Sequence, residues 1–336
     1  MNKMIKTGVL SYGMSGKLFH CPFISRHVKF DLVAIVERHT KQAQLDYPNI
    51  KSYDKVDDLL KDTDIELVVV NTPNVTHYDF SIMALQAGKH VLLEKPFTVT
   101  LQEAKSLYTE AKKQDRFILP FQNRRFDSDF LSVKRVVESG VLGDLIEVHF
   151  RYDRYTFDIS NNVTKELGTQ GNGLMYNLGP HLIDAAISLF GAPAKYHKIT
   201  GKNRPNTQVD DYAFVHMQFN SGLQVFITAS LLVAEPQAAF VLHGTKGSFV
   251  KSRSDVQESQ LQSGMKPDNK LFGKEAKGQE GLLTTVKNGY VKRKKVKAEL
   301  SSYLNMYEAV YQTLRCGQPF LVTENDILKQ MEILES

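Results

Sequence analysis

A glycine-containing turn between an expected strand and an expected helix is the feature that most constrains the fold. Residues 5–10 form a short apolar run, the turn 11–16 follows, and a helical pattern begins at Lys17. This order is the context in which a dinucleotide-binding turn occurs. Two glycines would let backbone approach a pyrophosphate and let the helix pack on the strand, while a serine caps the helix. The expected cofactor-contacting residues of the turn are Ser11, Tyr12, Gly13, Met14, Ser15 and Gly16.

An acidic residue follows the second expected strand, residues 31–36. Glu37 lies 24 positions after Gly13, about where a carboxylate would accept hydrogen bonds from the adenosine ribose hydroxyls. This favours NAD. Arg38 is adjacent and could instead meet a 2′-phosphate, so NADP remains open. Ser11 stands where the usual pattern has its first glycine, so the tight turn must tolerate a Cβ.

Strands and helices alternate with short links through the first part of the chain. Such alternation predicts a parallel sheet with right-handed crossovers, that is, a doubly wound α/β domain over residues 1–121. The further expected strands are 65–70, 90–93 and 117–121, and the expected helices are 52–62, 75–87 and 100–113.

Polar residues follow the carboxyl ends of these strands, where an open parallel sheet binds its ligands. After strand 65–70, we expect contacts with the nicotinamide side of a cofactor from Thr72, Pro73, Asn74 and His77, although His77 could instead cap or pack. The run 123–126 follows strand 117–121. It could hold a phosphate, a sugar hydroxyl or a carboxylate, or it could form the basic first turn of a helix that runs to Ser139.

Residues 92–97 bring a carboxylate, an amine and a proline to the end of a buried strand. Because proline cannot continue a strand ladder, the strand ends here and leaves Glu94 and Lys95 at the lip of any site. An amine held near low-dielectric walls can act as an acid or base near neutral pH. A surface lysine at a strand end is the alternative.

The pattern changes after the break at residues 140–143. The strands 145–152, 195–202, 209–220, 223–232 and 238–243 follow, with a hairpin turn at 221–222. We therefore predict an α+β second domain over residues 122–336, with an open, mostly antiparallel sheet.

The helix expected over residues 174–190 carries two stripes. Its apolar stripe faces a core. Its polar stripe, Asn177, His181, Asp184 and Ser188, lacks the Lys, Glu and Arg of ordinary solvated faces. Histidine suits proton transfer near neutral pH, and a carboxylate one turn later could orient it or accept a substrate hydroxyl. A structural histidine is the alternative.

Composition excludes several classes. The 336 residues suffice for about two domains, and no apolar run has the length of a membrane span. Only two cysteines occur, Cys21 and Cys316, which fits a reducing cytosol and a cytoplasmic protein. The net charge of +5 owes much to residues 287–297, for which a solvated edge hairpin or loop is favoured over nucleic-acid binding. We expect no nucleic-acid or membrane partner and no metal site.

Several motifs together make the chain resemble the glucose–fructose oxidoreductase / inositol dehydrogenase / rhizopine-catabolism (Gfo/Idh/MocA) family, most of all the bacterial branch with scyllo-inositol dehydrogenases. The resemblance spans nearly the whole chain. It rests on Gly13 and Gly16 and on the segments 72–74, 88–91, 94–96, 123–125, 140–143 and 178–184.

The resemblance implies a nicotinamide-dependent dehydrogenase acting on a sugar or cyclitol. It implies Lys95 and His181 as the catalytic pair, Asp184 as a substrate ligand, and an oligomer, a dimer or tetramer, formed through the open sheet. Asn177 replaces an aspartate that the family commonly has, which should alter rate or substrate choice, and Arg124 is expected to help bind substrate. The rivals are a non-catalytic nicotinamide-binding regulator on the same fold and a reductase of an imine or tetrapyrrole.

Overall fold

The chain forms two compact units. The computed structural model describes residues 3–159 and 166–336. The first unit contains residues up to 123 together with 257–272 and 302–331, and the second contains 124–256, 273–301 and 332–336. Two late segments thus join the first unit, outside the range 1–121 expected for the first domain.

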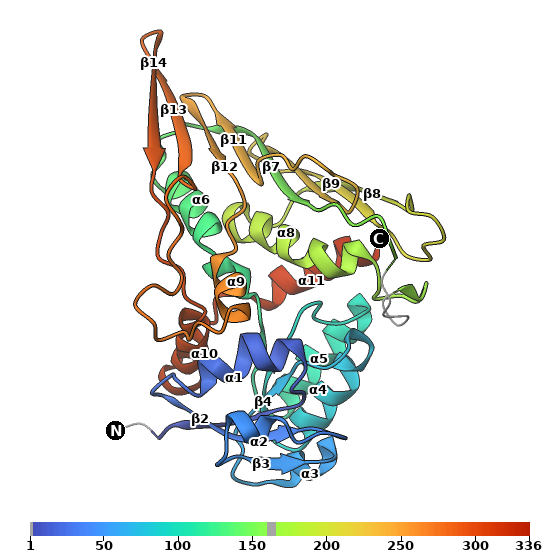
Figure 1. The fold of residues 1–336 in the computed structure, drawn as a ribbon. Helices are drawn as coiled ribbons and strands as arrows, with labels where there is room; N and C mark the ends of the chain where they lie inside the picture. Colours follow the sequence, from blue (N-terminus) through green and yellow to red (C-terminus); the bar gives the residue numbers. More distant parts are fainter. Residues whose placement is uncertain (1–2, 160–165) are drawn as a thin grey trace. The chain divides into compact units, whose positions relative to one another are not determined.

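A six-stranded parallel sheet forms the centre of the first unit (Figure 1). Its strand order is β3-β2-β1-β4-β5-β6, and each neighbouring pair is parallel. Crossovers run outward from β1 in one direction and from β4 in the other, which confirms the doubly wound prediction. The strands are β1 Ile5–Val9, β2 Phe30–Val36, β3 Lys51–Tyr53, β4 Leu67–Val70, β5 His90–Leu93 and β6 Ile118–Pro120.

Helices lie on both faces of this sheet, as right-handed crossovers require. On one side α4 contacts α3 and α5, and on the other α1 contacts the late helix α10. The segment 52–62, expected as one helix, instead begins as strand β3, because Ser52 and Tyr53 pair with β2. The helices of this part are α1 Cys21–Ile24, α2 Ala43–Asp46, α3 Val56–Lys61, α4 His77–Gln86, α5 Leu101–Lys113, α10 Leu304–Cys316 and α11 Glu324–Glu335.

An eight-stranded sheet forms the second unit, with the order β14-β13-β12-β11-β7-β10-β9-β8. All neighbouring pairs are antiparallel except β7 with β10, so the mostly antiparallel prediction is confirmed. The strands are β7 Leu145–Asp153, β8 Lys195–Gly201, β9 Tyr212–Gln218, β10 Gln224–Ser230, β11 Phe240–Gly244, β12 Gly247–Lys251, β13 Gly281–Lys287 and β14 Tyr290–Val296. The sequence analysis listed no strand for β12 or β13, and it gave the region of β14 only as an edge hairpin or loop over residues 287–297.

Helix α8, Leu174–Phe190, covers one face of this sheet and has the predicted bounds. It contacts β7, β9 and β10. Leu178, Leu182 and Ala186 of its apolar stripe are at most 3% exposed. Helix α6, Ser128–Glu138, contacts both α8 and β12.

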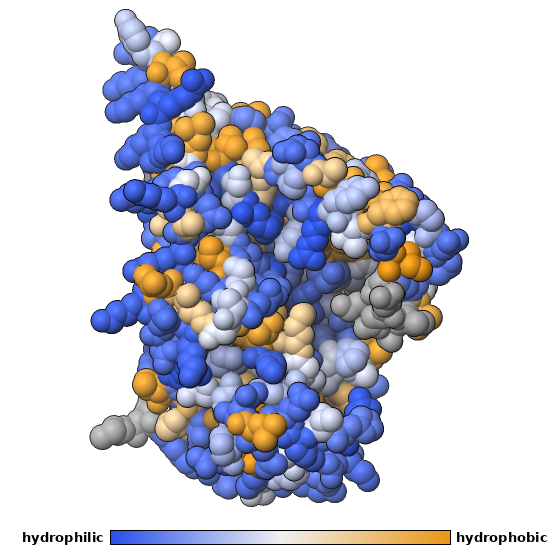
Figure 2. Space-filling model, in the orientation of Figure 1, coloured by the Kyte–Doolittle hydropathy of each residue, from blue (hydrophilic) through white to orange (hydrophobic). Residues whose placement is uncertain are grey.

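The basic stretch 287–297 forms the solvated edge hairpin expected for it. Strands β13 and β14 pair along their whole length, and nearly every residue of β14 is exposed. The hairpin is mostly hydrophilic at the upper left of Figure 2. Among the described helices, none is long and apolar enough to cross a lipid bilayer.

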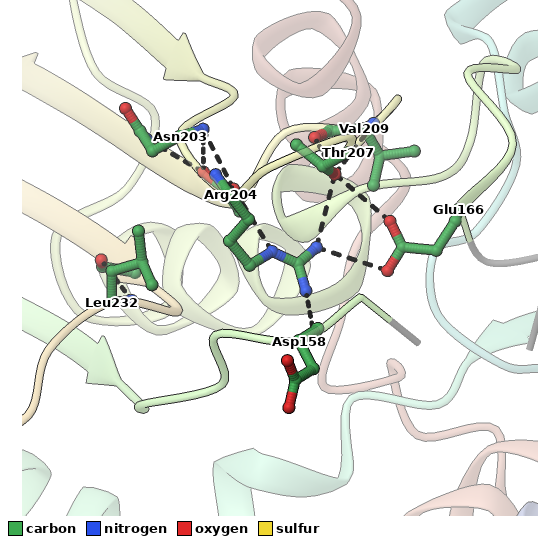
Figure 3. Close-up of polar contacts among 9 residues, drawn as sticks. Asp158, Glu166, Asn203, Arg204, Thr207, Val209 and Leu232 are labelled. Carbon is green, nitrogen blue, oxygen red and sulfur yellow. Dashed lines mark hydrogen bonds and ion pairs between the residues drawn. The ribbon is translucent and has the colours of Figure 1, made fainter. Parts of the chain in front are cut away.

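A buried arginine fastens the loops around β8 and β9 (Figure 3). Arg204 is 6% exposed, and its guanidinium contacts Asp211, Glu166, Thr207 and the Asp158 carbonyl. Burial alone would raise the pKa of Asp211, but backbone N–H donors of Arg204 and Asn203 outweigh it and lower that pKa. The carboxylate is therefore ionised at neutral pH.

Replacing this guanidinium should destabilise the fold. We expect Arg204→Met to lower the free energy of unfolding by about 3 kcal/mol at pH 7, because buried carboxylates lose their partner. The exposed Arg293→Met is the matched control, with a change below about 0.5 kcal/mol. Urea unfolding measures both.

The destabilisation caused by Arg204→Met should depend on pH. Because the folded-state pKa of Asp211 is lowered, its contribution is present above the unfolded-state pKa and disappears as pH falls through the folded value. The gap between wild type and Arg204→Met should therefore narrow at acidic pH. A gap that widens on acidification would contradict this account.

Candidate functional site

The two glycines of the first turn have different surroundings. A Cβ on Gly16 would lie 2.0 Å from the Ser11 carbonyl oxygen, so this close approach of helix and strand requires glycine. A Cβ on Gly13 would meet only the Ser11 hydroxyl, at 3.5 Å, and Gly13 is exposed. Gly16 therefore serves packing, while Gly13 leaves the backbone open to a ligand, as expected for a pyrophosphate turn.

The remaining side chains of the turn have defined contacts. The Ser11 hydroxyl accepts a hydrogen bond from the Gly13 amide at 3.2 Å, so a serine fits this tight turn. The expectation that the Ser15 side chain caps the helix is wrong. The Ser15 hydroxyl donates to Glu94 at 2.8 Å instead. Tyr12 donates to Asp46 at 2.6 Å, and Met14 is 64% exposed.

The acidic residue after β2 is already engaged. One carboxylate oxygen of Glu37 accepts a hydrogen bond from the Ala43 amide, at the start of α2, at 2.9 Å. Arg38 is exposed. The side chains that could read the 2′ position of an adenosine ribose are thus a partly occupied carboxylate and a solvent-facing guanidinium.

An asparagine links the turn after β4 to the glycine turn. The Asn71 side chain is 8% exposed and donates to the Ser11 carbonyl at 2.9 Å. Its Oδ1 is buried and has no hydrogen-bond partner within residues 3–159 and 166–336. A buried acceptor without a donor is costly, so this site fits a ligand that brings a hydroxyl or amide. Sequence reasoning did not single out Asn71, although it directly follows a buried strand.

His77 joins the loops after β4 and β5. It is 1% exposed, and its two ring nitrogens lie 2.8 and 2.9 Å from the carbonyl oxygens of Pro96 and Thr72. Thr72 also accepts a hydrogen bond from the Thr76 hydroxyl. This burial suits a histidine that positions both loops.

Glu94 collects hydrogen bonds at the end of β5. Its carboxylate accepts from the Ser15 hydroxyl, from Nε2 of His20 at 3.0 Å, and from the Lys95 amide at 3.1 Å. Burial would raise the pKa of Glu94, but the hydrogen bond and charge of His20, the charge of Lys95 and the Ser15 hydroxyl outweigh it and lower the pKa to about 2. Glu94 is thus ionised beside the half-buried Lys95.

The polar stripe of α8 varies in exposure along the helix. Asn177 is exposed, His181 and Ser188 are partly buried, and Asp184 is 4% exposed. Asp184 is therefore the most buried side chain of the stripe predicted from spacing. Lys95 belongs to the first unit and His181 to the second.

Two arginines at the start of the second unit pair with carboxylates of the same unit. Arg125 makes a bidentate contact with Asp184, with N–O distances of 2.7 and 2.8 Å. Arg124 donates to Asp127 at 3.0 Å and to Asp255. Sequence reasoning named Arg124 and Asp184 as substrate ligands and gave a carboxylate as one possible partner of the run 123–126, which includes Arg125. It did not pair Arg125 with Asp184.

His181 and these ion pairs share a small cavity. Its volume of about 20 Å³ suffices for about one water molecule. The cavity is lined by the two arginines, by His181 and Asp184, and by Phe130 and Arg253 among others. Charged side chains therefore line this cavity together with His181.

Comparison with protein families decides which fold family this is. Residues 5–121 match the model described as "Oxidoreductase family, NAD-binding Rossmann fold", and residues 130–250 match the "GFO/IDH/MocA C-terminal domain". The chain belongs to the Gfo/Idh/MocA family. It is accordingly an oxidoreductase with an NAD-binding Rossmann domain.

Full-length relatives agree. An uncharacterized oxidoreductase, YhhX of Escherichia coli, is 36% identical over 99% of this chain and 95% of its own length. The scyllo-inositol 2-dehydrogenase (NADP(+)) IolW of Bacillus subtilis is 30% identical over 99% and 92%. The solved structure of the putative oxidoreductase yvaA from Bacillus subtilis superimposes with a TM-score of 0.95 at 30% identity, covering 99% of this chain and 95% of that one.

Substitutions of Gly13 and Gly16 should affect different properties, cofactor affinity for the first and stability for the second. Gly13→Ala should fold with wild-type stability but bind nicotinamide nucleotides at least about tenfold more weakly, since a methyl group would occupy the ligand's approach. Gly16→Ala should lower the thermal midpoint, since its methyl group meets a backbone carbonyl. Calorimetric cofactor titration and thermal unfolding separate the two effects. Equal nucleotide affinity in Gly13→Ala and wild type would contradict the assignment.

Proposed function

We propose that the protein is an NAD(P)-dependent dehydrogenase that moves a hydride between the cofactor and a secondary hydroxyl or ketone of a sugar or cyclitol. The observation that carries this proposal is an ionised Glu94 beside Lys95, directly after β5 of an NAD-binding Rossmann sheet. The polar stripe of α8 and the named inositol dehydrogenase relative support a polyol substrate.

Lys95 and His181 are the proposed catalytic residues. The Lys95 ammonium would donate a hydrogen bond to the reacting oxygen and stabilise the negative charge that develops there. His181 would take the hydroxyl proton during oxidation and return it during reduction. The hydride chemistry would be that of a nicotinamide held by the Rossmann domain.

Asn177, Asp184 and Arg124 are the proposed substrate-binding residues. Asn177 is exposed and can present an amide to a ring hydroxyl. Asp184 and Arg124 have charged partners, so we propose that they bind substrate by fixing the charged wall of the cavity that His181 also lines. Replacement of the family's usual aspartate by Asn177 would make this wall less negative.

We propose NAD or NADP as the cofactor, bound by residues 11–16, by the loop residues Thr72, Pro73 and Asn74 with His77 behind them, and by Glu94 and Lys95. The Glu37 carboxylate favours NAD, whereas the exposed Arg38 would favour a 2′-phosphate. The inositol dehydrogenase relative is named for NADP(+).

A screen tests the activity. Purified protein with NAD+, NADP+, NADH or NADPH is presented with cyclitols, aldoses and their ketones, and reduced nicotinamide is followed by absorbance. Turnover of a polyol supports the proposal. Cofactor binding without turnover across the panel would favour the regulator, and turnover only of imines or planar tetrapyrroles would favour a different reductase.

Two substitutions test the catalytic pair. Lys95→Ala and His181→Ala should each lower kcat roughly 100- to 10,000-fold, because each removes a positioned acid–base or charge-stabilising group. The exposed Lys113→Ala and His243→Ala serve as controls and should retain wild-type rates. Near-full turnover in either site variant would refute the mechanism.

We also propose that the sheet of the second unit mediates a homo-oligomer, with a second copy covering its outer face. In register across β8, β9, β10, β7 and β11 lies a row of residues: His197, His216, Phe226, His149 and Val241. Phe226 stacks on His216 at 4.6 Å and on His149 at 5.0 Å between ring centroids. Such an aromatic row without Lys, Arg, Asp or Glu suits burial against the same row of a partner.

The substitution Phe226→Glu should reduce the molar mass in light scattering to that of one chain, because a carboxylate would be buried in the interface. Tyr290→Glu in the exposed hairpin is the control and should leave the mass unchanged. A monomeric wild type, or an unchanged oligomer in Phe226→Glu with native circular dichroism, would exclude this interface.

A further inference from the structure

Three segments far apart in the chain form a buried chain of hydrogen bonds that ends at Glu94. The Tyr307 hydroxyl of α10 lies 2.8 Å from Nδ1 of His20, and Nε2 of His20 lies 3.0 Å from Glu94. His20 and Tyr307 are both 0% exposed. All three residues belong to the first unit.

The direction of this chain follows from its chemistry. A carboxylate only accepts hydrogen bonds, so Nε2 of His20 must carry the proton directed at Glu94. The Tyr307 hydroxyl donates to Nδ1 of a neutral imidazole and accepts from Nδ1 of a protonated one. Burial raises the pKa of Tyr307 well above its usual value, so this hydroxyl keeps its proton. In both states of His20 the hydrogen bonds link Tyr307 to Glu94.

The hydroxyl of Tyr307 has no packing role. The Tyr307 ring lies among Phe23, Phe30 and Phe121, with centroid distances of 5.6–6.3 Å. A phenylalanine would fill the same space and avoid the cost of burying a polar group. The hydroxyl is explained by its bond to His20.

Glu94 is also hydrogen-bonded to the glycine turn and to the Lys95 backbone. It accepts from the Ser15 hydroxyl in the glycine turn and from the backbone N–H of Lys95. The titratable groups that face it are His20, Lys95, His77 and Tyr307. Of these, Lys95 is the only one assigned a role in the proposed reaction.

We propose that Tyr307 and His20 are positioning residues that hold Glu94 as a fixed anion, so that Glu94 orients Lys95 and favours its ammonium form. The proposal rests on the dehydrogenase function proposed above. By this proposal, a hydrogen-bond chain that starts at Tyr307 in the late helix α10 helps to position Lys95.

Kinetics test the proposal with graded variants. Glu94→Gln should lower kcat about 10- to 100-fold, and Tyr307→Phe should lower it about 3- to 10-fold. His20→Phe should have an effect between these two. His20→Asn can still donate a hydrogen bond, so its kcat should be higher than that of His20→Phe. Tyr108→Phe is the matched control and should keep wild-type kcat. Tyr108 is also buried and stacks on Phe97, two residues after Lys95, but its hydroxyl has no hydrogen-bond partner in the described part of the chain.

The pH profile separates positioning from mere stabilisation. An adjacent anion favours the ammonium, so its removal should let Lys95 lose its proton more easily. The alkaline limb of kcat/KM in Glu94→Gln should therefore move to lower pH by about one unit. If Glu94 has only a structural role, Glu94→Gln should lower the thermal midpoint and leave the alkaline limb unchanged, and that result would overturn the proposal. Wild-type kcat in folded Tyr307→Phe and His20→Phe would also overturn it.

A second measurement does not depend on turnover. Reductive methylation with ¹³C-formaldehyde labels lysines, and Lys95→Arg identifies the Lys95 signal. The NMR titration midpoint of Lys95 should fall in Glu94→Gln even if no substrate is found. This measurement therefore separates failure of the proposed function from failure of this inference.

The same midpoint in wild type and Glu94→Gln would overturn the inference. If Glu94→Gln does not fold, the Lys95 midpoint is measured in Tyr307→Phe, where it should also fall.

Discussion

The hydrogen bonds of the Glu94 carboxylate determine the architecture of the first unit's ligand-binding edge. Strand β5 is buried up to Leu93, and the chain then places a carboxylate at the sheet's carboxyl end. Removing an anion from water is unfavourable unless donors replace the lost solvent. Here the donors come from Ser15, His20 and the Lys95 backbone, so the glycine turn, the first helix and the lysine must take up their observed positions together.

Local pattern was sufficient for the elements with strong periodicity. The strand–turn–helix at the start, β5 and α8 followed from apolar runs, glycines and a 3.6-residue spacing, and the bounds of α8 and β5 coincide with those predicted. Strand β14 could not be found this way, because nearly every residue in it is exposed and most are charged, so it has no alternating pattern. Its structure depends on pairing with β13.

Individual site residues were visible in the sequence, but their partners were not. Ser15 and Glu94 are 79 positions apart, Arg125 and Asp184 are 59 apart, and His20 and Tyr307 are 287 apart. Capping rules assigned the Ser15 hydroxyl to its own helix, since they consider only neighbours along the chain. An ionised carboxylate is a stronger acceptor, so Glu94 is the better partner for that hydroxyl.

The return of the late segment 302–331 to the first unit has a chemical reason as well as a packing one. Helix α10 covers part of that unit with Tyr307 and Val310, both 0% exposed. Any apolar helix could supply such cover. What α10 adds is a phenolic hydroxyl at the far end of the hydrogen-bond chain to Glu94, which an apolar residue cannot provide. The Rossmann sheet alone therefore does not account for how Lys95 is held, because part of its support is encoded more than 200 residues after the lysine itself.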